Sequence, residues 1–145
     1  MCTRLILVLL ALLLPACART DESLEHLLTR AESSRLGDRP PLYMEAARRQ
    51  LDAADQFYNE GKVEQAHQAL QDVDAYSDKA RDAALQSNKK VKDTEIAVRR
   101  MAGRLHDLEN TVGFDEQPSV QAAAVHLEGI RTELLHRMFG KKGGK

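Results

Sequence analysis

The sequence predicts an all-α fold: an elongated antiparallel helical hairpin or bundle, coiled-coil-like, built on one long heptad-patterned helix. Three observations support this fold class. Glycine and proline occur mainly in short segments that separate long stretches rich in strong helix formers. Within those stretches, apolar residues recur at spacings of three and four. Residues 62–112 contain no proline and carry an uncharged heptad stripe, although 30% of the chain is charged.

The first helix is expected over residues 21–36. The segment 37–41, Gly-Asp-Arg-Pro-Pro, should end it, because Gly37 suits a C-terminal cap and prolines cannot continue a helix. Its apolar positions are Leu24, Leu27, Leu28 and Ala31.

The second helix is expected over residues 41–59, followed by a tight turn at 59–62. Gly61 can take the positive φ that such a turn demands. So short a connection sends the next helix back antiparallel to its predecessor. The apolar stripe of the second helix is Met44, Ala47, Leu51, Ala54 and Tyr58.

The third helix is expected to be long, about 62–112, which corresponds to roughly 75 Å if it is continuous. Its middle, 77–87, places only small residues on the stripe, so either a partner helix approaches closely there or the helix breaks near 86–90. The stripe reads Val63, Ala66, Leu70, Val73, Ser77, Ala80, Ala84, Ser87, Val91, Thr94, Val98, Met101, Leu105, Leu108 and Val112.

A fourth helix is expected over residues 118–139, after a cap at Gly113, and 140–145 reads as a basic flexible tail. The second and fourth helices should fold back on the two halves of the long one. Two-helix layers leave apolar surface exposed, which the first helix, a homodimer or a partner helix would cover. The stripe of the fourth helix is Val120, Ala123, Leu127, Ile130 and Leu134, extended by Met138 and Phe139.

The N-terminus reads as a secretory signal. Arg4 precedes an apolar run over 5–14, which at about ten residues fits a signal h-region and is shorter than the ~20 residues that span a bilayer. The Leu14-Pro15-Ala16-Cys17 segment that follows resembles the lipobox of bacterial lipoproteins, with Pro15 a departure from its usual small residue.

This resemblance implies cleavage between Ala16 and Cys17 and lipidation of Cys17, with acyl chains that anchor the protein to a membrane. Ala18 after the cysteine points to the outer membrane, on its periplasmic face. The alternative is an ordinary secretory signal cleaved near Ala16 or Ala18. The expected organisation is a signal peptide (1–16), a lipidated tether (17–20), a helical domain (21–139) and the tail (140–145).

The amino-acid composition argues against several classes of function. Of the 2 cysteines, Cys2 leaves with the signal and Cys17 carries lipid, so neither serves a disulfide, zinc site or nucleophile. Lys+Arg (21) nearly balance Asp+Glu (22) and Trp is absent, which argues against nucleic-acid binding. Without a Gly-rich phosphate loop or a strained serine elbow, we expect no enzyme activity, cofactor or small-molecule substrate.

Two Glu-x-x-His pairs, Glu64 with His67 and Glu133 with His136, have the spacing found in di-iron helical bundles. Both pairs lie beside the apolar stripes and interrupt neither of them. We therefore interpret them as solvated helix faces and expect no metal site.

Residues 53–70 resemble the turn region of a tetratricopeptide repeat, with Ala54, Phe57, Gly61 and Ala66 at the family's small, aromatic and turn positions. The chain holds one such copy, whereas solenoids stack several. Asp78 stands about where the family places a proline. A plain helical hairpin is the alternative interpretation.

Positive charge gathers at 87–92 and 99–104 on the long helix. These stretches read as a solvated face or as a contact for an acidic partner, lipid headgroups or cell-wall polymer. Lys145 adds a further hypothesis, because the murein lipoprotein family combines a lipidated cysteine, a heptad helix and a C-terminal lysine joined to peptidoglycan. We expect an envelope lipoprotein that acts as a non-catalytic scaffold or adaptor for a protein partner; the alternative is a tether from outer membrane to peptidoglycan through Lys145.

Overall fold

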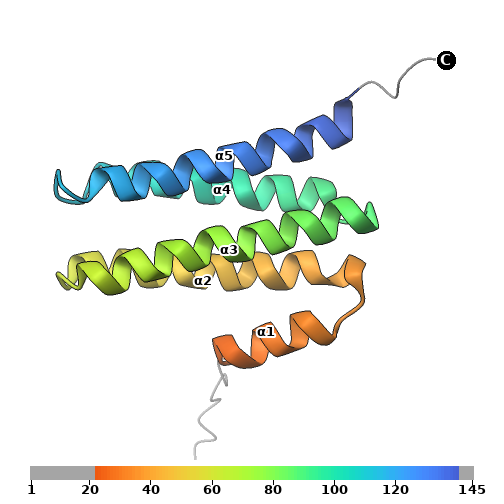
Figure 1. Cartoon of the computed structure of the whole chain (residues 1–145), viewed down its shortest axis with the longest axis horizontal. Helices are drawn as coiled ribbons and strands as arrows, with labels where there is room; N and C mark the ends of the chain where they lie inside the picture. Colours follow the sequence, from red (N-terminus) through yellow and green to blue (C-terminus); the bar gives the residue numbers. More distant parts are fainter. Residues whose placement is uncertain (1–21, 141–145) are drawn as a thin grey trace, which may run out of the picture.

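The computed structural model describes residues 22–140, and the regular structure in that range is entirely helical (Figure 1). The all-α prediction is therefore confirmed for the described part of the chain. The expected signal peptide, lipidated tether and residues 141–145 of the tail lie outside it. The elements in order are α1 (Leu24–Ser33), the short 3-10 helix η1 (Leu36–Asp38), α2 (Arg39–Asn59), α3 (Val63–Ser87), α4 (Val91–Glu109) and α5 (Gln117–Phe139).

Helices α2 and α3 form the antiparallel hairpin that the sequence predicts. Gly61 has a φ of 71° in the turn between them, in the left-handed region that glycine enters at little cost. Helix α2 begins two residues earlier than expected, at Arg39, because Pro40 and Pro41 occupy its first turn, where a missing N–H leaves no bond unmade.

The helix expected over 62–112 is not continuous: the chain breaks after Ser87 and α4 starts at Val91, so of the two alternatives left open by the sequence the break near 86–90 is the one found. Asn88 and Lys90 take positive φ values of 54° and 60°, which reverses the chain direction in three residues. Asn is among the few residues that tolerate this conformation. The break lies in the 86–90 region, next to the small-residue part of the heptad stripe.

The reversal stacks two hairpins into one four-helix bundle with α1 on its side (Figure 1). Helix α3 packs along α5 and α2 packs along α4, so each hairpin covers the apolar face of the other. The expectation of two separate two-helix layers is therefore wrong. A continuous α3–α4 helix would hold the hairpins apart and leave both faces in water, which explains why the folded-back arrangement is favoured.

The heptad stripe correctly identifies the residues that face inward. Its positions are buried from Ala66 to Ala84 and from Val91 to Leu108, and Val63, Ser87 and Val112 at the helix ends are half-buried. The stripes of α2 and α5 are also buried, apart from half-buried Tyr58 and Met138 and an exposed Phe139. These residues form one core shared by α2, α3, α4 and α5.

Helix α1 is shorter than the expected 21–36 and ends at Ser33, so Gly37 is not its cap. Gly37 lies in η1 against the side chain of Lys89, and a β-carbon there would stand 2.6 Å from Lys89 Cδ. Leu27 and Ala31 anchor α1 to the bundle and are fully buried. The helix therefore covers part of the hairpin, as the sequence suggested.

Candidate functional site

The residues that the sequence singles out most sharply lie outside the described range. Cys17, with its cleavage partner Ala16, and Lys145 all fall in the segments 1–21 and 141–145. Lipidation, signal cleavage and attachment to peptidoglycan therefore stay predictions. Within residues 22–140, no helix is both long and apolar enough to cross a membrane.

The structure separates the two Glu-x-x-His pairs and gives their members other partners. His67 Nε2 lies 2.7 Å from Glu116 Oε2, and the Glu133 carboxylate lies 3.5 Å from the guanidinium of Arg81. Among the described residues, no group of three or more His, Cys, Asp or Glu side chains is placed to hold a metal ion.

The boundary between α3 and α5, here called the α3–α5 seam, is tied by polar contacts along its length. They are His67–Glu116 (2.7 Å), Asp78–His126 (3.1 Å), Arg81–Glu133 (3.5 Å), and the donations from Arg137 to the Leu85 carbonyl (3.0 Å) and to Asn88 Oδ1 (3.2 Å).

Two polar atoms of α3 are buried beside this seam without a described hydrogen-bond partner, Asp74 Oδ1 and Ser77 Oγ. Burial raises the pKa of Asp74 to about 6; the charge of His126 lowers it and that of Asp78 raises it. These groups are dispersed along a packed helix interface and are not gathered at a cleft. We therefore expect these groups to affect the stability of the bundle and not to form a reactive site.

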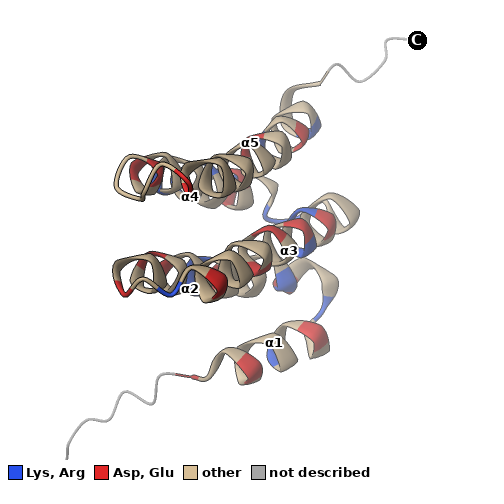
Figure 2. Cartoon of the chain, turned by 60° about the vertical axis from the view of Figure 1, so that its left-hand side comes forward, with Lys and Arg blue, Asp and Glu red and all other residues tan. Residues whose placement is uncertain are grey.

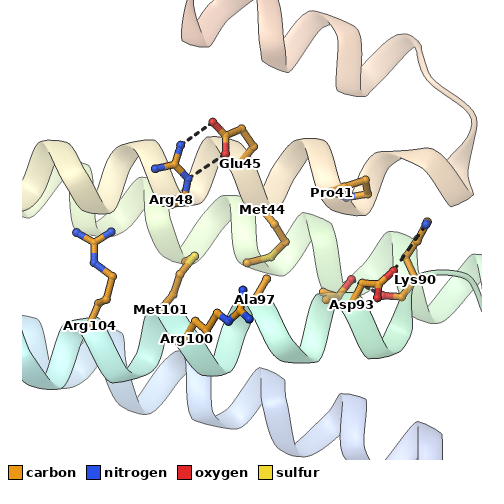
Figure 3. A pocket seen from close by; sticks show the side chains of 11 residues that line it. Pro41, Met44, Glu45, Arg48, Lys90, Asp93, Ala97, Arg100, Met101 and Arg104 are labelled. Atoms are coloured by element: carbon orange, nitrogen blue, oxygen red, sulfur yellow. Dashed lines mark hydrogen bonds and ion pairs between the residues drawn. The ribbon is translucent and has the colours of Figure 1, made fainter.

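The boundary between α2 and α4 is hollow. It holds a groove of about 430 Å³, here called the α2–α4 groove, within the size range of small-molecule sites (Figure 3). The most buried lining residues are Thr94, Met101 and Met44, which are 2%, 4% and 6% exposed, and Ala97 between the helices is half-buried. The lining is Pro41, Met44, Glu45 and Arg48 from α2 and Lys90, Asp93, Thr94, Ala97, Arg100, Met101 and Arg104 from the α4 side.

Guanidinium groups gather at one end of the groove. Arg48 Nη1 and Arg104 Nη1 lie 2.9 Å and 2.6 Å from the two oxygens of a single carboxylate, Asp52. Arg48 is also paired with Glu45, whose hydrogen bond raises the pKa of that guanidinium. Arg100 stands one turn from Arg104 on α4, and no carboxylate of the described chain lies within ion-pair distance of it.

The opposite end of the groove is electrically balanced. Lys90 Nζ lies 3.6 Å from Asp93 Oδ2, and Pro41 forms the facing wall from α2 (Figure 3). The groove therefore runs from the Lys90–Asp93 pair to the end where Arg48 and Arg104 share Asp52, and the unpaired Arg100 lies beside its apolar middle (Figure 3). Elsewhere the two signs are mixed on the surface, as Figure 2 shows for α1, α2 and α3.

Sequence reasoning found half of this site. The basic stretches 87–92 and 99–104 supply Lys90, Arg100 and Arg104. Met44 and Met101 read only as core positions, and nothing in the sequence places Arg48 beside Arg104. Their meeting depends on the reversal at 88–90, which brings α4 alongside α2.

In comparisons with known proteins, no family model, no curated protein and no solved structure matches the chain. The class that the fold defines is a helical-bundle protein.

Proposed function

We propose that this protein is a lipid-anchored scaffold or adaptor on the periplasmic face of the outer membrane, presenting helical surface to a protein partner in the cell envelope. The observation that carries the proposal is the lipobox-like segment ending at Cys17.

The anchor is tested by Cys17→Ser in the organism's own envelope. Fractionation should find the protein no longer bound to the membrane, because no acyl chain is attached. A Cys2→Ser variant is the matched control and should stay membrane-bound. Unchanged membrane association of the Cys17→Ser variant would contradict the anchor.

The adaptor role is tested separately by placing a photocrosslinking amino acid at Phe114 or Phe139, which are 84% and 78% exposed. A protein partner should yield discrete adducts from one of these positions, because exposed aromatic side chains are favoured contact residues. Exposed Gln71 on α3 is the control position. Equal labelling at all three positions would contradict a defined contact surface.

The alternative role, a tether to peptidoglycan, is supported by Lys145 at the end of the basic tail. Muramidase digestion followed by mass spectrometry should then find a muropeptide on Lys145. Lys145→Ala should abolish it, and Lys142→Ala should leave it unchanged. Finding Lys145 unmodified throughout would exclude the tether.

The finer description of the fold is also part of the proposal: the bundle is elongated and its helices pack in a coiled-coil-like manner. Support comes from the heptad stripe, which stays in frame through α3 and α4 and is buried in both. Small-angle scattering should give the profile of a rod with a length near that of α3, about 37 Å for its 25 residues.

A further inference from the structure

We propose that the α2–α4 groove binds a single-chain anionic amphiphile of the fatty-acid class, with its acyl chain against the groove's methionine side chains and its carboxylate at Arg100. This inference goes beyond the adaptor role and does not depend on it. It departs from the expectation, made from the sequence, that the protein has no small-molecule substrate. No pattern in the sequence indicates the groove.

The floor of the groove suits an acyl chain. Met44 extends from α2 toward Ala97 of α4, whose small side chain leaves space there, and Met101 lies one turn further along α4 (Figure 3). Methionine side chains are flexible and polarisable, so they adapt to chains of different shape. The lining spans Lys90 to Arg104, about 21 Å along the axis of α4, which matches an extended molecule.

One cation of the groove is unpaired, and its place sets the position of the headgroup. Arg48 and Arg104 share Asp52 at one end, where Arg48 is also paired with Glu45, and Lys90 and Asp93 neutralise each other at the other end. Arg100 extends from α4 beside Ala97, in the middle of the groove (Figure 3). Arg100 has no carboxylate partner among the described residues and is available to an incoming anion. Guanidinium groups bind carboxylates through paired hydrogen bonds, so one anionic headgroup fits beside Arg100.

The geometry favours a ligand of finite length over a helix of a partner protein. The Arg104–Asp52 ion pair crosses from α4 to α2 at 2.6 Å and bounds the groove at one end. A partner helix, about 10 Å across with its side chains, would have to pass over this bridge to continue along the boundary. A short amphiphile stays within the groove and does not have to cross this bridge.

The test uses the full chain in nanodiscs of neutral phosphatidylcholine and a fatty acid carrying a mid-chain diazirine. After illumination, mass spectrometry locates the adducts. Labelling should concentrate at Met44, Ala97 and Met101, and unlabelled laurate should compete. The methyl ester of the same probe should label the groove about tenfold less, a difference of ~1.4 kcal/mol, because it lacks the charge.

Two variants separate the headgroup from the floor. Arg100→Ala should lower labelling by the acid about tenfold, whereas Arg99→Ala, its sequence neighbour paired with Glu95 and outside the groove, should leave it unchanged. Ala97→Phe fills the space beside Met44 and should abolish labelling by acid and ester alike. Circular dichroism and urea unfolding of each variant confirm that it is folded.

Three results would overturn the proposal: adducts scattered over the surface, equal labelling by acid and ester, or labelling that survives Ala97→Phe. If the groove stays unlabelled and Ala97→Phe instead alters the sedimentation of the chain, the occupant is a second copy. If it stays unlabelled and a crosslinker at Ala97 captures an acidic helix of another protein, the groove is a protein-docking site. Both outcomes contradict the amphiphile.

Discussion

The two boundaries between the hairpins differ in how they are closed. Along the α3–α5 seam, five polar contacts from His67 to Arg137 tie one helix to the other. Across the α2–α4 groove, the ion pair of Arg104 with Asp52 does so at one end only. The same four-helix arrangement thus provides one boundary that fixes the hairpins together and one that retains accessible apolar space. Under the proposal made above, stability and binding belong to opposite sides of the bundle.

The largest expected effect comes from comparing core truncations on the two sides. Leu127→Ala removes a fully buried side chain of α5 and should lower the free energy of unfolding by about 4 kcal/mol, since the cavity is enclosed. Met44→Ala enlarges an existing groove and should cost only about 2 kcal/mol. Urea unfolding measures both. Equal losses would show that the groove side is as tightly packed as the core.

The next-largest effect is expected at the chain reversal between α3 and α4, which brings the two hairpins together and so creates both boundaries. Lys90 has a φ of 60°, a conformation that costs a non-glycine residue about 1 to 2 kcal/mol. Lys90→Gly should therefore stabilise the bundle by about 1 kcal/mol, measured by urea unfolding. Lys89→Gly, at the neighbouring position without a positive φ, is the control and should not stabilise it. A loss of stability in Lys90→Gly would contradict the strained turn.

A pH-dependent difference is expected on the α3–α5 side. Because burial raises the pKa of Asp74 to about 6, the folded state holds this proton more tightly than the unfolded chain, and the carboxyl destabilises the bundle increasingly as pH rises from about 4 through 6. Asp74→Asn should gain about 1 kcal/mol at pH 7 after allowance for partial solvent screening, and nothing below pH 4.

The measurement is urea unfolding of both proteins across this pH range. Asp72→Asn, where the carboxylate accepts a weak bond from Gln68 on the same helix, is the matched control. A gain for Asp74→Asn that is constant with pH would show that the buried carboxyl is not the cause.

The smallest effects concern the ion pairs that cross each boundary. Arg81 is 19% exposed and lies close to Asp78, Asp82 and Glu133. Changing it to Ala should lower the free energy of unfolding by about 1 kcal/mol. Arg104 is 44% exposed, so changing it to Ala should lower the free energy of unfolding by about 0.5 kcal/mol or less. Thermal unfolding at low and high salt measures both losses. A larger loss for Arg104 would show that the groove end is structural.

Much of the fold was predictable because its signals are local. The apolar stripes of α2, α3, α4 and α5 follow from spacings of three and four, and the turn at Gly61 follows from one residue's conformational freedom. The groove was only half predictable. Its basic residues stand together in the sequence, whereas Met44 and Arg48 come from a helix more than forty residues earlier.

The sequence by itself determined which residues face inward, because helical periodicity depends only on neighbours along the chain. Tertiary structure decided that α3 and α4 are separate helices. The heptad frame counts Ser87 and Val91 as successive positions whether the helix runs on or turns back, so the sequence left open whether the helix breaks near 86–90. The reversal at Asn88 and Lys90 is favoured by burial of one hairpin against the other, an interaction between residues far apart in the chain.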